Sequence, residues 1–218
     1  GEDPGMYGIY TEEELQKFRD GSDPYGYPNT DWNKEVLLPR AWQQMHSLTA
    51  SGGSDKVKYF AGFGYVKQDA LYGDTRTNKS TSGFNRYNAR VNIDANIVDK
   101  YLNLSADMAY RQEDRNSIAG STSDVFNNMH RNPQTDPGRF PDGNLGKVSL
   151  GVNPIGLATE GGWVKDRKSV LNTRFMLDFN VPGLEGLNLK GIFSYDKIFN
   201  SIKRWTTPVD FYVSVSYT

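Results

Sequence analysis

The stretch RYNARVNIDANIVDKYLNLSADMAYR, residues 86–111, decides the fold. Successive side chains of a β-strand point to opposite faces, and apolar and polar residues alternate in this way on both sides of Asp99-Lys100. Folding the stretch about that dipeptide brings Ile93 opposite Ala106 and Asn92 opposite Asp107. A slip of one residue would mix the faces, so the pattern predicts an antiparallel hairpin in this register. Its apolar face holds Tyr87, Ala89, Val91, Ile93, Ala95 and Ile97 on one strand and Leu102, Leu104, Ala106, Met108 and Tyr110 on the other, with Ile97 opposite Leu102.

Two further segments fold in the same way. One hairpin is predicted about Gly53-Ser54, with Ala50 opposite Val57 and Leu48 opposite Tyr59. The other is predicted about Leu184; its pairs are Val181 with Leu187, Phe179 with Leu189, Phe175 with Phe193, Asn180 with Asn188 and Asp178 with Lys190. Three hairpins give about six strands of about ten to twelve residues, longer than the usual strand of globular proteins.

The segments between the hairpins are longer and more polar than the turns. Asp69 to Gly83 is a loop of moderate length, and Glu113 to Asp166 is a very long one rich in Gly, Pro, Asn and Asp. Short turns on one side and long loops on the other are typical of outer-membrane β-barrels. Near the N-terminus, Thr11 and Glu14 form a capping box that predicts a short helix over 11–20. We therefore expect an extracellular loop with this helix over 1–44, strands over 45–112, a long extracellular loop over 113–167, and strands with a following loop over 168–218.

A soluble β-sandwich also produces alternation and is the main alternative for the fold. Three tyrosines favour a membrane barrel, because Tyr65, Tyr110 and Tyr195 each lie on the apolar face about eleven residues after a predicted turn. At about 3.3 Å per residue and roughly 45° of tilt this distance is about 25 Å, the height of the apolar band that aromatic girdles bound in such barrels. The sequence thus predicts an all-β fold, an antiparallel segment of a transmembrane β-barrel.

Composition agrees with this fold and limits the function. The 218 residues have a hydrophobic fraction of 37%, an aromatic fraction of 13% and a mean hydropathy of -0.66, as expected when only alternate strand residues face lipid. The net charge of -1 disfavours nucleic acid as a partner, and the absence of cysteine excludes disulfides and thiolate metal sites. No apolar run is long enough for a membrane helix, and no signal peptide opens the chain.

Three segments resemble the SusC/RagA family of TonB-linked barrels of Bacteroidetes. They are Tyr10 to Gly21 with Tyr27 to Trp32; His46 to Gly53 with Val57 to Phe60 and Gly64-Tyr65; and Phe84 to Asn92. The second half of the chain resembles the family only in its pattern. The resemblance implies an outer-membrane importer of glycans or peptides that TonB powers through a plug domain and that a SusD-like lipoprotein covers as a lid. The plug and the TonB contact are not in this sequence, so we expect the chain to need the remaining barrel and plug segments, to lie against outer-membrane lipid, and to be unable to transport alone.

Few residues suggest chemistry of their own. His46 and His130 lie far apart, and neither Asp20 to Asp23 nor Asp136 to Asp142 has the spacing of a calcium loop, so we predict no metal, no cofactor and no catalytic residue. The candidates for substrate contact are lumen charges and one loop tryptophan. They are Arg86, Arg90, Asp107, Arg111 and Trp163. We expect most of the charges to pair with neighbours, Arg90 with Asp107 diagonally, and Trp163 to stack on a sugar or to anchor its own loop.

The main functional hypothesis concerns the long loop. Its apolar residues are numerous enough for a local core: Val125, Phe126, Met129, Phe140, Val148, Leu150, Ile155, Leu157 and Trp163. We predict that it packs over the barrel mouth and contributes to contact with the lid. The alternative function is a small outer-membrane barrel or adhesin-like surface protein that binds a partner. An enzyme such as a glycan hydrolase is disfavoured, because no motif offers a carboxylate pair.

Overall fold

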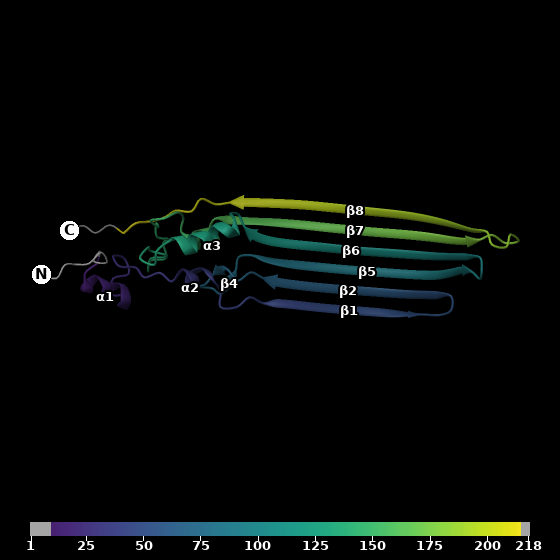
Figure 1. The fold of residues 1–218 in the computed structure, drawn as a ribbon, viewed down its shortest axis with the longest axis horizontal. Coiled ribbons are helices and arrows are strands. Elements are labelled where there is room, and N and C mark those ends of the chain that lie inside the picture. The colour runs from purple at the N-terminus through teal and green to yellow at the C-terminus, as the bar shows by residue number, and fades with distance from the viewer. Residues whose placement is uncertain (1–9, 215–218) are drawn as a thin grey trace.

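The computed structural model describes residues 10–214, and its main feature is one antiparallel sheet of six strands. The strand order is β1-β2-β5-β6-β7-β8, so every strand lies beside its neighbour along the chain (Figure 1). The strands are β1 (Gln43–Gly53), β2 (Val57–Asp69), β5 (Gly83–Val98), β6 (Leu102–Ile118), β7 (Gly162–Asn180) and β8 (Asn188–Thr206). The all-β fold is therefore confirmed.

The remaining elements gather at one end of the sheet (Figure 1). They are α1 (Glu12–Asp20), α2 (Trp32–Val36), the small hairpin of β3 (Gly73–Asp74) and β4 (Lys79–Ser80), α3 (Thr122–Arg131) and α4 (Pro154–Thr159). The three tight turns lie at the opposite end. The predicted separation of short turns from long connections is confirmed. Among the described residues, no helix has the length and apolar character needed to cross a membrane.

Two of the three predicted hairpins have the predicted register. In β5–β6, Ile93 lies opposite Ala106 and Asn92 opposite Asp107, although a bulge beside the turn places Val98, not Ile97, opposite Leu102. In β7–β8, Phe175 lies opposite Phe193.

The register predicted for β1–β2 is wrong by four residues. Ala50 lies opposite Ala61 and Leu48 opposite Phe63, because β1 continues through Gly53. The turn follows at Ser54, whose Oγ accepts the backbone N–H groups of Lys56 and Val57 at 3.3 Å each. A shift of an even number of residues preserves the faces, so the predicted apolar set stays together.

The strands are longer than predicted. They have 11, 13, 16, 17, 19 and 19 residues from β1 to β8. As a result β6 runs to Ile118 and β7 starts at Gly162, which shortens the loop expected over 113–167 to 119–161. The helix expected over 11–20 is present as α1, with Thr11 as its N-cap, the capping box to Glu14, and Gly21 in the left-handed region at its end.

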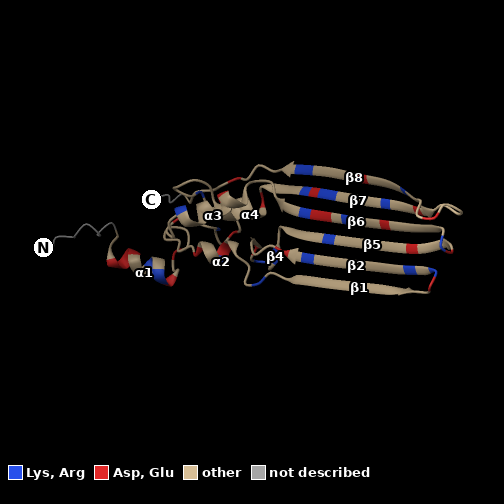
Figure 2. Ribbon diagram, turned by 45° about the vertical axis from the view of Figure 1, so that its right-hand side comes forward, with Lys and Arg blue, Asp and Glu red and all other residues tan. Residues whose placement is uncertain are grey.

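The sheet has one apolar and one polar face over its turn-side part. We define the apolar face by Tyr59, Val91, Ile93, Met108 and Phe175, which share it by strand register. Each is between 39% and 50% exposed, so this face is uncovered in the isolated chain. The alternate residues, including Arg90, Asn92 and Asp107, form the polar face. Charged residues of both signs concentrate toward the helical end of the sheet, while β1 carries none (Figure 2).

The tyrosines at the limit of the apolar face form an inclined line across the sheet. Tyr65 lies opposite Tyr87, whereas Tyr110 lies opposite Ala89, two residues nearer the turns. Tyr195 is two residues nearer the turns again. It lies opposite Thr173, Thr173 lies opposite Met108, and Met108 lies opposite Val91. From β2 to β8 the line therefore moves toward the turns by about one residue for each neighbouring strand. A residue spans about 3.3 Å along a strand and strands lie about 4.8 Å apart, so the line is inclined by about 35°, at the lower limit of the strand tilt in outer-membrane barrels. The three turns step in the same direction (Figure 1).

The helical end of the molecule has its own hydrophobic core, and we call this part the cap. Its buried residues are Trp32, Val36, Ile118, Val125, Met129, Leu145, Val148, Ile155 and Ala158. The predicted local core of the long loop is therefore present, with differences: Phe126, Leu150 and Trp163 are 36%, 47% and 37% exposed. Residues from the N-terminal segment, Trp32 and Val36, complete it.

Candidate functional site

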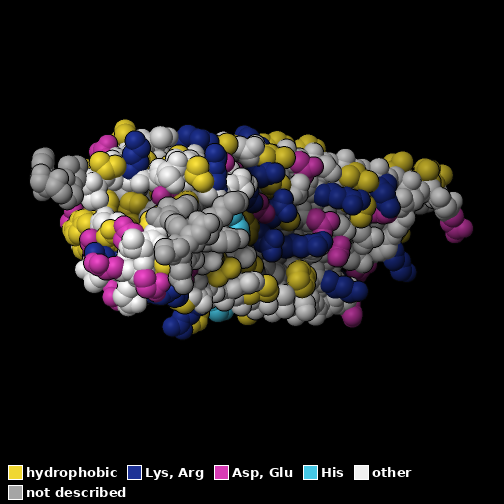
Figure 3. Space-filling view, turned by 60° about the vertical axis from the view of Figure 1, so that its left-hand side comes forward, with side chains coloured by type: hydrophobic (Ala, Val, Ile, Leu, Met, Phe, Trp, Pro, Cys, Tyr) yellow, Lys and Arg dark blue, Asp and Glu magenta, His cyan; other side chains and the backbone are white. Residues whose placement is uncertain are grey.

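The polar face of β5, β6 and β7 carries a ladder of polar side chains in consecutive rows. Strand register places Arg86 opposite Glu113, Asn88 opposite Arg111, and Asn92 opposite Asp107. Four of the five predicted site residues, namely Arg86, Arg90, Asp107 and Arg111, lie in this ladder. Figure 3 shows cationic and acidic side chains side by side on one face of the molecule, from the cap into the sheet. The sheet thus brings these four residues together as one surface.

The predicted pairing of Arg90 with Asp107 is indirect. Arg90 Nε donates to Asn92 Oδ1 at 2.9 Å, and Asn92 Nδ2 donates to Asp107 Oδ1. Asn92 therefore joins the cation to the carboxylate, with each amide atom in the role that its chemistry allows. Diagonal neighbours in a sheet lie about 7–8 Å apart, which is why a third side chain fits between them.

Arg86 differs from the other arginines of the ladder. Its register partner Glu113 is engaged by Arg111, whose Nε lies 3.5 Å from Glu113 Oε1. Arg86 Nε is buried and has no hydrogen-bond partner among the described residues. A buried donor without an acceptor is costly, so among the described residues Arg86 is the ladder arginine with an unsatisfied buried donor.

Trp163, the fifth predicted residue, lies elsewhere. It belongs to β7 rather than to a loop, and by register it shares the apolar-face side of the sheet with Ile118 and Trp205. The Lys165 ammonium lies 4.6 Å from the centroid of its ring. Trp163 is therefore not part of the ladder, because the alternation of the strand turns it to the opposite face.

A groove lies between the ladder and the cap, and the sequence did not indicate it. It has a volume of about 470 Å³, and its lining includes Gln68, Tyr72, Phe84, Arg115 and Thr122. The Arg115 guanidinium lies 5.9 Å from the Phe84 ring centroid, and the Tyr72 hydroxyl lies 3.2 Å from Thr122 Oγ1. Hydroxyl, amide and guanidinium groups beside an aromatic ring suit a ligand with amide or hydroxyl groups. These residues come from the ends of β2, β5 and β6, from the segment between β2 and β3, and from the start of α3, so no local motif links them.

The cap is held over this end by hydrogen bonds between distant segments. Thr30 Oγ1 donates to the Asp136 carbonyl at 2.7 Å and accepts from the Gly138 N–H at 2.9 Å. Asn153 Nδ2 donates to the Gly138 and Gly146 carbonyls at 2.7 and 2.8 Å. Because Thr30 and Asn153 are buried, these bonds fix the loop path as well as satisfy polar groups.

One ion pair of the cap has a shifted titration. Arg76 contacts the Asp74 carboxylate at 3.0 Å within the β3–β4 hairpin, and this hydrogen bond lowers the pKa of Asp74 below its usual value. Among the described residues, no group of three or more His, Asp or Glu side chains is placed to hold a metal.

Comparison with known proteins gives the fold but not a family. No protein-family model and no curated protein matches the chain. A structure described as the RagAB peptide importer in the "open-open" state matches with a TM-score of 0.62 and 17% identity, over 94% of this chain and 24% of the matched chain. A structure of the RagAB peptide transporter matches with a TM-score of 0.56 and 16% identity, over 84% and 22% of the two chains. The chain thus has the fold of a segment of these proteins and spans about a quarter of their length.

Proposed function

We propose that the chain is part of the barrel wall of a TonB-dependent outer-membrane importer, and that the importer takes up peptides or glycans. The observation that carries the proposal is the division of the sheet into two faces. The apolar face is bounded by the inclined line of tyrosines, and the polar face holds the ladder. In a membrane barrel the first would face lipid and the second the lumen.

The open edges of the sheet support a role within a larger barrel. The outer edges of β1 and β8 have no strand partner among the described residues. Unpaired backbone groups are very costly in lipid, so the remaining strands of a barrel must pair with both edges. The fold shared with segments of the RagAB structures supports the same arrangement.

The cap and the groove support a role at the entrance of the importer. The cap lies at the end opposite the tight turns, which is the extracellular end in outer-membrane barrels. A SusD-like lipoprotein lid would meet the cap, and a substrate released by the lid would pass the groove and then the ladder. The proposal includes TonB and a plug as partners of the complete importer, and it assigns no catalysis to this chain.

The experiment is an uptake assay in the native host. The gene that encodes the chain is deleted and then restored, and growth on a peptide mixture or on a glycan as the sole carbon source is measured. Cell-surface binding of the same fluorescent substrate is measured in parallel, with and without collapse of the proton-motive force. Energy-dependent uptake that returns with the gene supports the importer. Surface binding without uptake would contradict it and favour an adhesin-like protein.

A further inference from the structure

The upper part of the apolar-face side of β7 and β8 is strongly basic. Beyond the tyrosine line this side carries Lys165, Arg167, Lys197 and Lys203, which we call the basic strip. Lys165 and Lys203 lie directly opposite each other on neighbouring strands. Like charges in this position repel each other, so the pair is stabilised when an anion lies between them.

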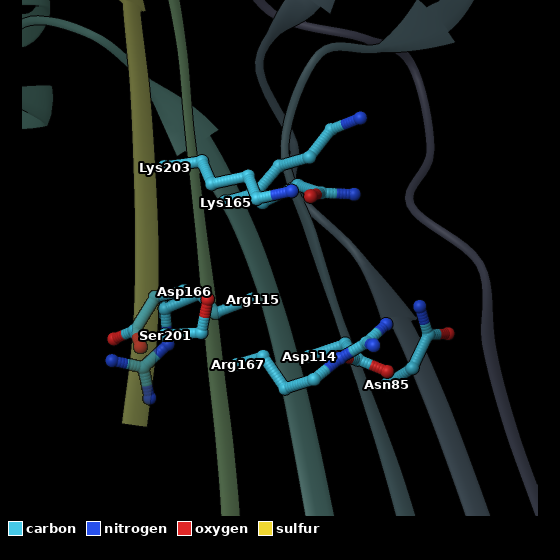
Figure 4. Close-up of a pocket in the computed structure, with 9 residues that line it drawn as sticks. Asn85, Asp114, Arg115, Lys165, Asp166, Arg167, Ser201 and Lys203 are labelled. Carbon is cyan, nitrogen blue, oxygen red and sulfur yellow. The ribbon is translucent and has the colours of Figure 1, made fainter. Parts of the chain in front are cut away.

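Few of the positive charges of the strip are neutralised by neighbouring carboxylates. Among the described residues, Arg167 is its single member in an ion pair, with Nε 2.5 Å from Asp114 Oδ1. The strip borders a depression of about 400 Å³ that Asn85, Asn116 and Ser201 also line. Figure 4 shows Lys165, Lys203, Arg167 and Asp114 directed to one side of the sheet, with Arg115 and Asp166 on the other. An excess of cations beside amide and hydroxyl groups fits an anionic, hydroxyl-rich ligand.

The height of the strip decides which ligand fits. Lys165 lies in the row of Asn116, six residues beyond Tyr110, and Lys203 lies eight residues beyond Tyr195. With about 3.3 Å per residue and the strand tilt of about 35–45°, the lysine pair stands about 15–20 Å above the tyrosine line. The headgroup layer of an ordinary bilayer is about 5–8 Å thick on each side, so a phospholipid headgroup is too short to reach the pair.

Two tryptophans lie in the next row on the same side. Trp163 and Trp205 are direct cross-strand partners and are 37% and 62% exposed. Exposed indole rings beside cations are suited to stack on sugar rings. From the turns toward the cap, this side of the sheet thus carries the apolar face, then the tyrosine line, then the basic strip, and finally the two tryptophans.

We propose that the basic strip and the Trp163–Trp205 pair bind the phosphorylated sugar headgroup of an outer-leaflet glycolipid. The lysine pair contacts the phosphate, Arg167 adds a planar donor, and the tryptophans contact the sugars. This inference rests on the proposed position of the sheet in the outer membrane. It is separate from transport, because the polar ladder faces the other way.

The test uses the complete polypeptide that contains this chain, inserted in phosphatidylcholine nanodiscs. Insertion is verified first by the shift in electrophoretic mobility between unheated and heated samples. The probe is fluorescent rough lipopolysaccharide, either intact or dephosphorylated. We expect tighter binding of the intact probe, and a loss of about fivefold in its affinity in the Lys165→Gln/Lys203→Gln variant, as two exposed ionic contacts provide. This variant retains the Arg167–Asp114 pair and so keeps the local ion pairing.

The matched control is Lys168→Gln/Lys190→Gln, which removes two lysines from the polar face and should bind the intact probe as the wild type does. Trp205→Leu should weaken both forms of the probe. Inorganic phosphate at millimolar concentration should not displace the glycolipid, which separates a lipid site from a free-phosphate site. An inserted protein that binds both forms of the probe equally, or that loses no affinity in the double variant, would overturn this inference while leaving the importer intact. A protein that does not insert would overturn the proposed function and this inference with it.

Discussion

Tyr65 and Tyr87 lie directly opposite each other across β2 and β5, with ring centroids 5.1 Å apart, at the limit of the apolar face. Their position defines how far lipid would rise along these strands. On the turn side of this pair the exposed residues of the face are apolar, and on the cap side Lys67 and Asn85 follow in the next row.

An arginine in the middle of the apolar face should destabilise the protein in a membrane. Ile93 lies six residues from Tyr87, and we expect Ile93→Arg to lower the free energy of unfolding by about 2–4 kcal/mol, the cost of an arginine at the bilayer midplane. The control is Ser105→Arg, which places the same charge on the polar face opposite Asp94. Urea unfolding of the complete protein in vesicles measures both, and equal losses in the two variants would argue against a lipid-facing surface.

The Asn92 bridge predicts a coupling that depends on a third residue. In a double-mutant cycle, Arg90→Ala and Asp107→Ala should show an interaction energy of about 0.5–1 kcal/mol in unfolding. The same cycle in an Asn92→Ala background should show almost none, because Arg90 and Asp107 are linked through that amide. A coupling that survives in this background would mean that the two charges interact directly.

Arg86 is the ladder residue that we expect to serve an external acceptor. Arg86→Met should reduce uptake about tenfold, the effect of losing one charge-assisted hydrogen bond, and Arg86→Lys should retain part of the activity. The stability of the barrel should not fall, because Arg86 Nε has no partner among the described residues. Lys190→Met serves as the control, since Lys190 pairs with Asp178 at 3.4 Å on the same face. A loss of stability equal to the loss of uptake would indicate a purely structural arginine.

The Asp74–Arg76 pair predicts acid sensitivity in the β3–β4 hairpin. The hydrogen bond from Arg76 lowers the pKa of Asp74 in the folded state, so its contribution is present above the ordinary value of 3.8 and is lost as the pH falls below it. Pepsin should therefore cleave residues 72–80 of the wild type faster as the pH falls through this window. The Asp74→Asn variant has no carboxyl group to protonate at this position. Its rate of cleavage in residues 72–80, relative to that at a distant reference site, should therefore not change with pH. The same pH dependence in both proteins would exclude Asp74 as its origin.

The cap should unfold without disrupting the sheet. Val125 is completely buried in the cap core, and Val125→Asp places a charge there by changing α3 rather than a strand. We expect hydrogen exchange to increase in α2, α3 and α4, normal insertion in the membrane, and loss of co-purification with the lid lipoprotein. Leu177→Asp, on the apolar face of β7, is the contrasting variant, since a charge there should affect strand assembly. Retention of the lid by a protein with an unfolded cap would remove the cap from the proposed contact.

The hairpins were predictable where the two faces differ in polarity. Ile93 and Asn92 have unambiguous preferences, so the β5–β6 register followed from the sequence. Around Ser51 to Ser54 the residues are small, and glycine there suggested a turn. The structure keeps Gly53 in the strand, and the turn is centred two residues later. A Cβ at Gly53 would lie 2.5 Å from the Val57 carbonyl oxygen, so this glycine allows a close backbone approach rather than a turn.

The ends of the long strands were not predictable for a related reason. Beyond the tyrosine line both faces are polar: Asp114 and Arg167 lie on one side, and Arg115 and Asp166 on the other. Alternation disappears when both faces meet water, so these residues appeared to be a loop. The same loss of signal hid the basic strip and misplaced Trp163. The groove depends on contacts between Tyr72 and Thr122, fifty residues apart, which no sequence period reports.

A scan of the solvent environment along β5 tests most directly whether the sheet is a membrane wall. A nitroxide spin label is placed at each position from Ala89 to Ile97 in the complete protein, reconstituted in phospholipid vesicles. Collision rates with oxygen, which concentrates in lipid, and with a water-soluble nickel complex are then measured. A lipid-facing apolar face predicts a period of two, with oxygen favoured at positions 89, 91, 93 and 95 and nickel favoured at 90, 92 and 94. Equal exposure of both sets to the nickel complex, or the opposite assignment, would contradict a membrane wall with an apolar outer face.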